Sequence, residues 1–421
     1  MEHPHDYALR MDIQYGLAAR QTAYVFPQHK AQQALYFLGN SLGLPAREAQ
    51  QVVYKITDEW AAHGVEGFFA AQPPWWDLET EAAAQLTPWL GAQPEEVAVL
   101  NSLTVNLHFL FLHFYKPTPQ RFKIIVEEKA FPSDQYLVQS QLEFHGLTPE
   151  VALIEVPRKG HGWSTQDFLE VIEREGDTVA LVFLGGVNYY NGQLLDLSTI
   201  AAAAQQQGAL FGLDLAHAIG NVPLALHAWQ VDFAAWCSYK YLNGGPGSIG
   251  GLFVHDKHLD KQGPALKGWW GVPKDKRFLM DPQFTAGASA AAWHQSTPSI
   301  LALAPLLAAL KVRNRLDPQA FFDEQKMLTD FLKQQLMPLT QQVNAPFEII
   351  TPSRHGAQLT LIFREKGKMI FDHLQAQGVY VDWREPNAIR LAPTALYNTF
   401  EEVYLLGQIL AETLDHCLGR A

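Results

Sequence analysis

The stretch that decides the fold is Cys237-Ser238-Tyr239-Lys240-Tyr241-Leu242-Asn243-Gly244-Gly245, in which one lysine lies in a glycine-rich loop. The apolar run 231–236 precedes it and is expected to form a buried strand. A second apolar run, 209–213, is followed by the motif Asp214-Leu215-Ala216-His217. Ligands of α/β sheets bind where the strands end, so Asp214 and Lys240 are expected to lie at one edge of a sheet and to share a site.

A lysine and an aspartate placed in this way match the needs of pyridoxal 5′-phosphate. The lysine amine forms an imine with the aldehyde of the cofactor, and the aspartate keeps the pyridine nitrogen protonated so that the ring accepts electrons. Taken alone, Lys240 would be interpreted as a solvated loop residue, and Asp214 as a turn former or helix cap. The spacing and the glycine-rich context of the two together favour the cofactor.

The composition indicates a well-packed protein of two domains. With 421 residues the chain is too long for one ordinary core, which predicts a large domain and a smaller one. Its 48% hydrophobic and 18% charged residues exclude a disordered chain. The net charge of −12 argues against a nucleic-acid surface, although backbone N–H groups can still build a local phosphate site.

Cysteine usage and the apolar runs predict a cytoplasmic protein. Cys237 and Cys417 are the only cysteines, so no disulfide framework is expected and a reducing compartment fits. Residues 1–10 are polar and lack the apolar segment of a secretory signal. The densest apolar run, 105–115, is interrupted by Asn106 and two histidines, which predicts a buried helix instead of a membrane span. No membrane contact and no metal ligands are predicted.

Apolar strand-like runs alternate with helical patterns through the middle of the chain. Strands are expected over 123–127, 151–156, 179–184, 209–214, 231–238 and 250–255, and helices over 133–145, 165–175 and 197–207. This alternation predicts an α/β large domain with a mostly parallel sheet between helices.

After Pro298 the pattern changes to that of a smaller α+β domain. Helices are expected over 300–311, 321–336, 369–377 and 399–418, and strands over 347–351, 358–363 and 388–392. The expected division is therefore a large cofactor-binding domain over 41–300 and a small C-terminal domain over 301–421. Residues 1–40 are expected to pack on the small domain.

Further motifs follow one another along the chain: Phe37-Leu38-Gly39-Asn40-Ser41-Leu42-Gly43, Asn101-Ser102-Leu103-Thr104, Phe131-Pro132-Ser133-Asp134, Gly192-Gln193 and Gly268-Trp269-Trp270-Gly271. With these motifs the chain resembles the kynureninases, fold-type I pyridoxal-phosphate enzymes related to the class V aminotransferases. The resemblance covers most of the chain, from Leu38 to the region of Ala392. It implies hydrolysis of L-kynurenine, with 3-hydroxy-L-kynurenine left open as the preferred substrate, to anthranilate or 3-hydroxyanthranilate and L-alanine. That reaction belongs to tryptophan catabolism by the kynurenine pathway, which also feeds NAD biosynthesis, and the resemblance implies a homodimer with active sites at the subunit interface.

The resemblance also assigns roles to individual residues. Lys240 is expected to form the Schiff base and to shuttle protons, Asp214 to pair with the pyridinium nitrogen, and Tyr239 to donate a proton. The cofactor site that it implies comprises Leu103, Thr104, Phe131, Pro132, Ser133, Asp134, Asp214, His217, Tyr239, Lys240 and Trp269, with Thr297 reaching the phosphate across the subunit boundary. Arg390 is the expected bidentate partner of the substrate carboxylate, and Asn40 and Ser41 would line the substrate end.

Several of these residues have an ordinary structural alternative. Thr104 and Asp134 are residue types that also cap helices, and each precedes or enters a predicted helix. His217 alone would be a core histidine, and Arg390 a solvated arginine in an edge strand. Tyr239, Trp269 and the pair Trp75-Trp76, which would otherwise wall the aryl pocket, could be core aromatics.

The chain departs from the family at Gly185, where some relatives carry serine near the phosphate, and at Asn188, where related animal enzymes carry histidine. Residues 285–296 do not align clearly. A cysteine desulfurase or another class V aminotransferase-like enzyme is the first alternative function, but Cys237 and Cys417 lie in strand and helix patterns, not in a mobile loop. The second alternative is a protein of this fold that binds a metabolite or a partner without catalysing a reaction. Such a protein would usually have lost the lysine or the aspartate that this chain keeps.

Overall fold

The largest element of the computed structural model, which describes residues 2–259, 263–341 and 345–419, is a seven-stranded sheet. Its strand order is β4-β10-β9-β8-β7-β5-β6. The strands are β4 (Val97–Ala98), β5 (Lys123–Glu127), β6 (Leu153–Val156), β7 (Val179–Gly185), β8 (Leu210–Asp214), β9 (Phe233–Trp236) and β10 (Gly251–Val254). The five strands from β9 to β6 run parallel, and β10 is antiparallel to both of its neighbours, β9 and β4. The predicted mostly parallel sheet is confirmed.

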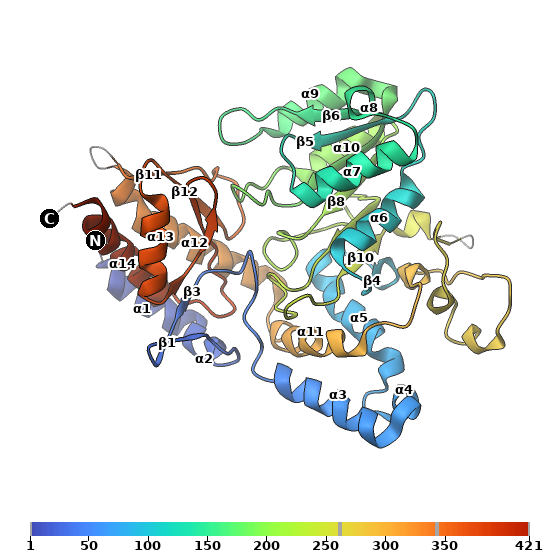
Figure 1. Cartoon of the computed structure of the whole chain (residues 1–421), viewed down its shortest axis with the longest axis horizontal. Helices are drawn as coiled ribbons and strands as arrows, with labels where there is room; N and C mark the ends of the chain where they lie inside the picture. The colour runs from blue at the N-terminus through green and yellow to red at the C-terminus, as the bar shows by residue number, and fades with distance from the viewer. Residues whose placement is uncertain (1, 260–262, 342–344, 420–421) are drawn as a thin grey trace.

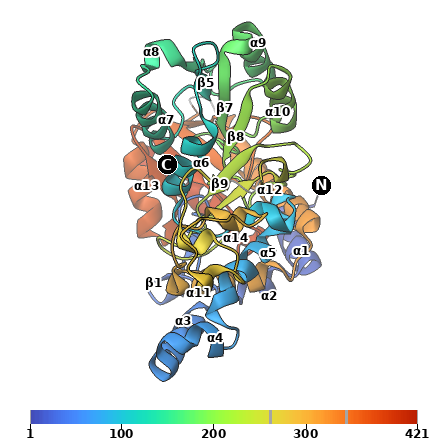
Figure 2. The same cartoon turned by 90° about the vertical axis from the view of Figure 1, so that its right-hand side faces the viewer.

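Helices cover both faces of this sheet (Figures 1 and 2). They are α5 (Leu78–Leu90), α6 (Leu103–Phe114), α7 (Pro132–Phe144), α9 (Thr165–Glu175) and α10 (Leu197–Gln206). Successive strand residues point to opposite faces, so Ile125 of β5 joins the core built with α9 and α10, and Ile124 joins the core built with α6 and α7. One expected strand differs, because Pro149 begins a short helix, α8 (Pro149–Ala152), and β6 starts only at Leu153.

A second, smaller sheet lies in the C-terminal part of the chain, with the all-antiparallel order β11-β12-β15-β14. Its strands are β11 (Phe347–Ile349), β12 (Leu359–Phe363), β14 (Asp382–Arg384) and β15 (Ala388–Leu391). The helices around it are α12 (Pro318–Thr340), α13 (Gly367–Ala376) and α14 (Phe400–Leu418). Among the described residues, none of the helices combines the length and the apolar content that crossing a membrane would need.

Elements from the N-terminal part of the chain contact this smaller unit. Helix α1 (Pro4–Tyr15), followed by α2 (Leu17–Gln21), packs on α14. The carboxylate of Asp12 accepts hydrogen bonds from the backbone N–H groups of Phe400, at 2.7 Å, and Glu401, at 3.0 Å, at the N-terminus of α14. The N-terminal segment also contributes strands, because β1 (Gln28–His29) and β2 (Gln32–Gln33) pair with each other, and β3 (Leu35–Tyr36) pairs in parallel with β13 (Val379–Tyr380).

Helix α11 (Ile300–Arg313) joins the two units. It packs against α3 (Ala49–His63) and α5, and Leu303 belongs to the core under the large sheet. Its later residue Val312 belongs to the core of the small unit. Arg313, at the end of the helix, is fully buried and lies over the ring of Trp89 at 4.7 Å. A short helix, α4 (Gly67–Ala70), follows α3 near the outer end of the molecule in Figure 1.

Candidate active site

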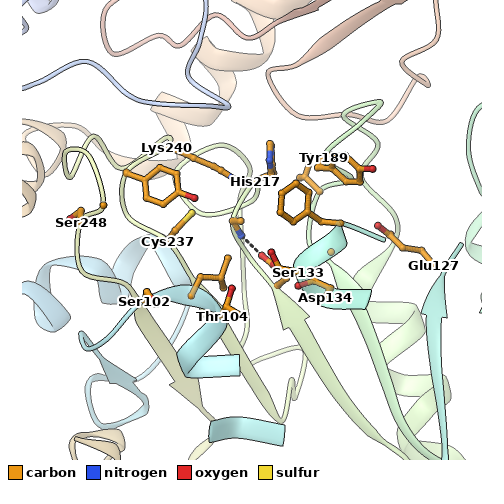
Figure 3. A pocket seen from close by; sticks show the side chains of 18 residues that line it. Ser102, Thr104, Glu127, Ser133, Asp134, Tyr189, His217, Cys237, Lys240 and Ser248 are labelled. Atoms are coloured by element: carbon orange, nitrogen blue, oxygen red, sulfur yellow. Dashed lines mark hydrogen bonds between the residues drawn. The ribbon is translucent and has the colours of Figure 1, made fainter. Parts of the chain in front are cut away.

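A cavity of about 170 Å³ lies where the parallel strands end (Figure 3). Its walls come from the end of β8, the loop after β9, the start of α7 and the N-terminus of α6. Of the predicted site residues, those that line it are Leu103, Thr104, Phe131, Ser133, Asp134, Asp214, His217, Tyr239 and Lys240. Residues far apart in the sequence are therefore brought together as the strand order predicts.

The loop after β9 holds Lys240 in a compact turn. The N–H of Asn243 donates to the carbonyl of Lys240 at 3.1 Å, and the N–H of Gly244 donates to that of Ser238 at 2.8 Å. Asn243 has a φ of 59°, in the left-handed region that asparagine tolerates better than most residues. The Nζ of Lys240 lies 5.8 Å from the ring centre of Phe131 and 5.9 Å from that of Tyr239. The amine thus faces the cavity between two aromatic walls.

Two carboxyl groups lie opposite the lysine. Asp214, at the end of β8, is buried, and its Oδ1 accepts the N–H of Ala216 at 2.6 Å. Asp134, in the first turn of α7, is also buried, and its Oδ1 has no hydrogen-bond partner within the described residues. Burial and the negative charge of Asp214 raise the pKa of Asp134 well above its ordinary value, and burial also raises the pKa of Asp214. A cationic ring nitrogen beside this pair would relieve the repulsion.

The N-terminus of α6 enters the cavity and suits an anion. Ser102, Leu103 and Thr104 line this end, and the first N–H groups of the helix have no partner within it. The hydroxyl of Ser248, from the loop before β10 that lies against this terminus, is buried without a hydrogen-bond partner in the described part of the chain. Because α6 begins at Leu103 with Ser102 at the N-cap, Thr104 does not cap the helix, and Asp134 lies inside α7 instead of capping it.

Aromatic and imidazole side chains complete the walls. The ring of Phe131 meets that of Tyr189 edge to face, with centres 5.1 Å apart. His217 is buried near Lys240 (Figure 3), and burial together with the charge of Lys240 lowers its pKa well below the ordinary value. His217 is therefore neutral and adds no charge to the cavity.

Some predicted cofactor residues lie outside the cavity of the single chain. Pro132 begins α7 but is not among the lining residues. The indole N–H of Trp269 donates to the carbonyl of Arg277 at 3.0 Å, and the side chain is 43% exposed. Thr297 is exposed and lines a neighbouring hollow, and Ser102 lines both that hollow and the cavity. Neither Trp75 nor Trp76 reaches the cavity.

The predicted substrate residues lie on the small unit and on the segment before α3, beside the cavity and not in it. Arg390, in the interior strand β15, is 1% exposed, so the solvated edge-strand alternative is wrong. Its Nε donates to Asp382 Oδ2 at 2.6 Å and its Nη1 to the carbonyl of Tyr189, whereas Nη2 is buried without a partner in the described ranges. Asn40 donates to Gln358 Oε1 at 2.7 Å and leaves its own Oδ1 unpartnered there. A carboxylate could satisfy the free guanidinium nitrogen.

Ser41 follows Asn40 in a segment held against the lysine loop. Its N–H donates to the carbonyl of Leu38 at 2.9 Å. The N–H of Gly43 donates to the carbonyl of Tyr239 at 2.8 Å, and a Cβ at this glycine would collide with the carbonyl of Lys240. The close approach explains why glycine stands at this position.

Sequence reasoning missed several residues that line the cavity: Ser102, Glu127, Gly185 as a lining residue, Val187, Tyr189, Ala216, Cys237, Gly247 and Ser248. A signal existed for Glu127, because it ends strand β5 at the same edge at which Asp214 ends β8. No comparable signal marks Tyr189, whose backbone carbonyl, not its side chain, binds Arg390.

The geometry agrees with comparisons to known proteins. The family model of class V aminotransferases matches residues 44–364, so the chain is a member of that class. The model of the kynureninase C-terminal domain matches residues 324–410. Kynureninases from Flavobacterium psychrophilum and Flavobacterium johnsoniae are 46% and 45% identical over 411 and 415 residues, which cover 96% and 97% of this chain and 97% and 98% of theirs. The chain therefore belongs to the kynureninase family.

A solved structure shows the same fold. The cystine C-S lyase C-DES, in complex with its reaction product cysteine persulfide, superposes with a TM-score of 0.77 at 19% identity, over 90% of this chain and 97% of that one. The predicted fold-type I architecture, with a large domain and a smaller C-terminal domain, is confirmed.

Proposed function

We infer that this chain is a pyridoxal-phosphate-dependent kynureninase that hydrolyses L-kynurenine to anthranilate and L-alanine. The observation that carries this conclusion is the single cavity in which Lys240 and Asp214 meet the N-terminus of α6. Membership of the kynureninase family over nearly the whole chain supports the same substrate.

The cavity fits the cofactor at three points. Lys240 supplies the amine that binds it, Asp214 and Asp134 supply the carboxyl pair for a protonated ring nitrogen, and the N-terminus of α6 with Ser248 supplies unpaired donors for a phosphate. When bound, pyridoxal phosphate supplies a ring that withdraws electrons from the α-carbon of the substrate. Gly185 lines the cavity without offering a hydroxyl, so Ser102, Thr104 and Ser248 are the hydroxyl donors that we propose for the phosphate.

The remaining steps fall to side chains of the chain itself. Lys240, once released by the substrate amine, removes the α-proton and returns it during the reaction. Burial raises the pKa of the Tyr239 hydroxyl, so Tyr239 stays protonated. It can therefore donate its proton to the carbon of the fragment that becomes alanine, once the carbon–carbon bond has been cleaved. The free Nη2 of Arg390 binds the substrate carboxylate, and Asn40 and Ser41 lie at this end.

The experiment that tests this function is a steady-state fluorescence assay of the purified protein with pyridoxal phosphate and L-kynurenine. We expect cofactor-dependent release of anthranilate, and the rate with 3-hydroxy-L-kynurenine run in parallel fixes the preference between the two substrates. Sulfide release from L-cysteine without anthranilate formation would instead support the desulfurase alternative. That outcome is not expected, because burial raises the pKa of Cys237 and keeps its thiol protonated.

We also propose that the enzyme is a homodimer that buries the apolar patch formed by the partly exposed Trp76 and the exposed side chains of Phe69, Trp269, Phe278, Leu279 and Met280. The rings of Trp76 and Phe278 stack with centres 5.5 Å apart, and Phe278, Leu279 and Met280 are all more than half exposed. Contiguous exposed apolar surface of this kind usually marks an interface. A second copy bound to this patch would bring further residues toward the cavity. We propose that Trp269 and Thr297 contact the phosphate in this dimer.

Phe278→Asp is expected to weaken the dimer by at least about 30-fold, because it buries a carboxylate in an apolar contact. Sedimentation equilibrium measures the change. Ile13→Asp is the matched control, since Ile13 is 83% exposed on α1, away from the patch, and this variant should remain dimeric. A wild-type monomer at high concentration, or an unaffected F278D dimer, would refute this interface.

We place the enzyme in the cytoplasm, because both cysteines are free and buried and need no oxidising compartment. We further propose a large cofactor-binding domain over residues 41–300 and a small domain over 301–421, with residues 1–40 packed on the latter. Within this division α11 would be the connecting helix, since its residues enter both cores.

A further inference from the structure

A third buried carboxyl group lies beside the pair described above. Glu127 ends β5, is 4% exposed and lines the cavity on the side of Asp134 (Figure 3), and Asp214 lines the same cavity. Three ionisable groups interact with it: the charge of Asp214, at the end of β8, raises the pKa of Glu127, and the charge of Glu127 raises the pKa values of Asp134, on α7, and of Tyr189, after β7. No lysine, arginine or histidine among the described residues forms an ion pair with Glu127.

One neutral donor holds Glu127 in place. The amide Nδ2 of Asn188 donates to Glu127 Oε1 at 3.0 Å. The orientation of this amide is fixed, because its Oδ1 accepts the N–H groups of Tyr190, at 3.0 Å, and Asn191, at 3.1 Å. The small sheet anchors the same loop, since Gln358 Nε2 donates to the carbonyl of Tyr189 at 3.1 Å. Glu127 therefore cannot turn away from the carboxyl pair without losing this bond.

We propose that Glu127 is a positioning residue that stores one proton for the Asp134–Asp214 pair and releases it to solvent when the pyridinium ring binds. Three carboxylates cannot all be charged in so small a buried space while the cationic ring is absent, so Glu127 shares the retained protons with Asp134, whose pKa is raised well above its ordinary value. The inference rests on the proposed cofactor position and not on the identity of the amino-acid substrate.

The direction of the proton movement follows from charge. Burial raises the pKa of Glu127 to about 7, the bond from Asn188 opposes this rise, and the charge of Asp214 adds to it. A protonated ring nitrogen beside Asp214 stabilises negative charge nearby and lowers the pKa of Glu127, so its O–H bond breaks and the proton leaves. Far above pH 7 the proton is already absent, and far below it Glu127 stays protonated in both states. Extra proton release is therefore greatest near pH 7.

The test is isothermal titration calorimetry of pyridoxal phosphate into the full-length apoprotein, in buffers of different ionisation enthalpy, from about pH 6 to about pH 9. The number of protons released is compared between the wild type and Glu127→Gln, which keeps the hydrogen-bonding shape but cannot ionise. We expect the wild type to release about half a proton more near pH 7. Lys240 and the cofactor contribute equally in both proteins, so the difference reports the proton of Glu127 together with the effect of its charge on Asp134. Glu155→Gln is the matched control, because Glu155 is exposed on β6 and pairs with Val126, the neighbour of Glu127.

A second variant tests the proposal independently. Asn188→Asp keeps the oxygen that accepts from Tyr190 and Asn191 but replaces the donor to Glu127 by a carboxyl oxygen. We expect the extra release to move to higher pH by about one unit. Equal proton counts in E127Q and the wild type at every pH would overturn the proposal. If E127Q does not bind the cofactor, a pH profile of proton release in N188D that matches the wild type overturns the proposal. Failure of the wild type to cleave kynurenine would instead refute the proposed function, and the measured proton release would still decide the role of Glu127.

Discussion

Lys240→Ala is expected to lower the turnover of L-kynurenine by at least about 10³-fold, because it removes both the amine that binds the cofactor and the group that moves the α-proton. Lys240 is the only lysine among the residues that line the described cavity, so no neighbour replaces it. Steady-state release of anthranilate by the purified variant, measured at saturating pyridoxal phosphate, gives the result.

The control for this prediction is Lys116→Ala, an exposed lysine just after α6, which should keep the wild-type rate. Far-ultraviolet circular dichroism shows whether K240A is folded. Turnover within tenfold of the wild type in a folded K240A protein would remove Lys240 from its proposed role.

Arg390→Lys is expected to lower kcat/KM for L-kynurenine by about 100-fold, which corresponds to about 3 kcal/mol. The guanidinium now serves Asp382 and the Tyr189 carbonyl and still offers Nη2 to a carboxylate. A lysine amine has a single nitrogen and cannot reach all three partners. The loss should appear mainly in KM, and an analogue of kynurenine without its α-carboxylate should be equally poor with both proteins.

Arg384→Lys provides a close comparison. Arg384 lies on the adjacent strand β14, its Nε is 3.2 Å from the same Asp382 Oδ2, and its side chain is 43% exposed. Solvent screens this ion pair, so R384K should change kcat/KM by less than about threefold. Equal losses in R384K and R390K would show that Asp382, not the substrate carboxylate, explains the effect.

The large sheet and the helices that cover it could be predicted from sequence because both carry strong local signals. Helix α9 is an example: Ser164 caps its first turn, Gly176 ends it, and the predicted range 165–175 is the observed one. The strands β5 and β8 are buried on both faces, so their apolar runs and their final acidic residues mark the edge where the cavity forms.

Other parts of the site depend on contacts that one sequence does not display. Strand β14 has three residues and no apolar run, so the sequence gives no sign that Asp382 lies beside Arg390. Thr104 and Asp134 have the chemistry of helix caps, and only the observed helix starts separate the two roles. Trp269 and Thr297 lie outside the cavity of the single chain, and under our proposal they contact the cofactor only in the homodimer, so their test is the oligomer.

The packing of α1 on α14 constrains the order in which the chain folds during synthesis. Asp12 is synthesised 388 residues before Phe400 and 389 before Glu401, whose N–H groups are its partners. Domains generally fold as they emerge from the ribosome, but this unit is built from segments that precede and follow the large unit in the sequence. Helix α1 must therefore wait, with the residues that contact α14 uncovered, until α14 has been translated. Chaperones that bind emerging amphipathic helices have a defined interval in which to act on this enzyme.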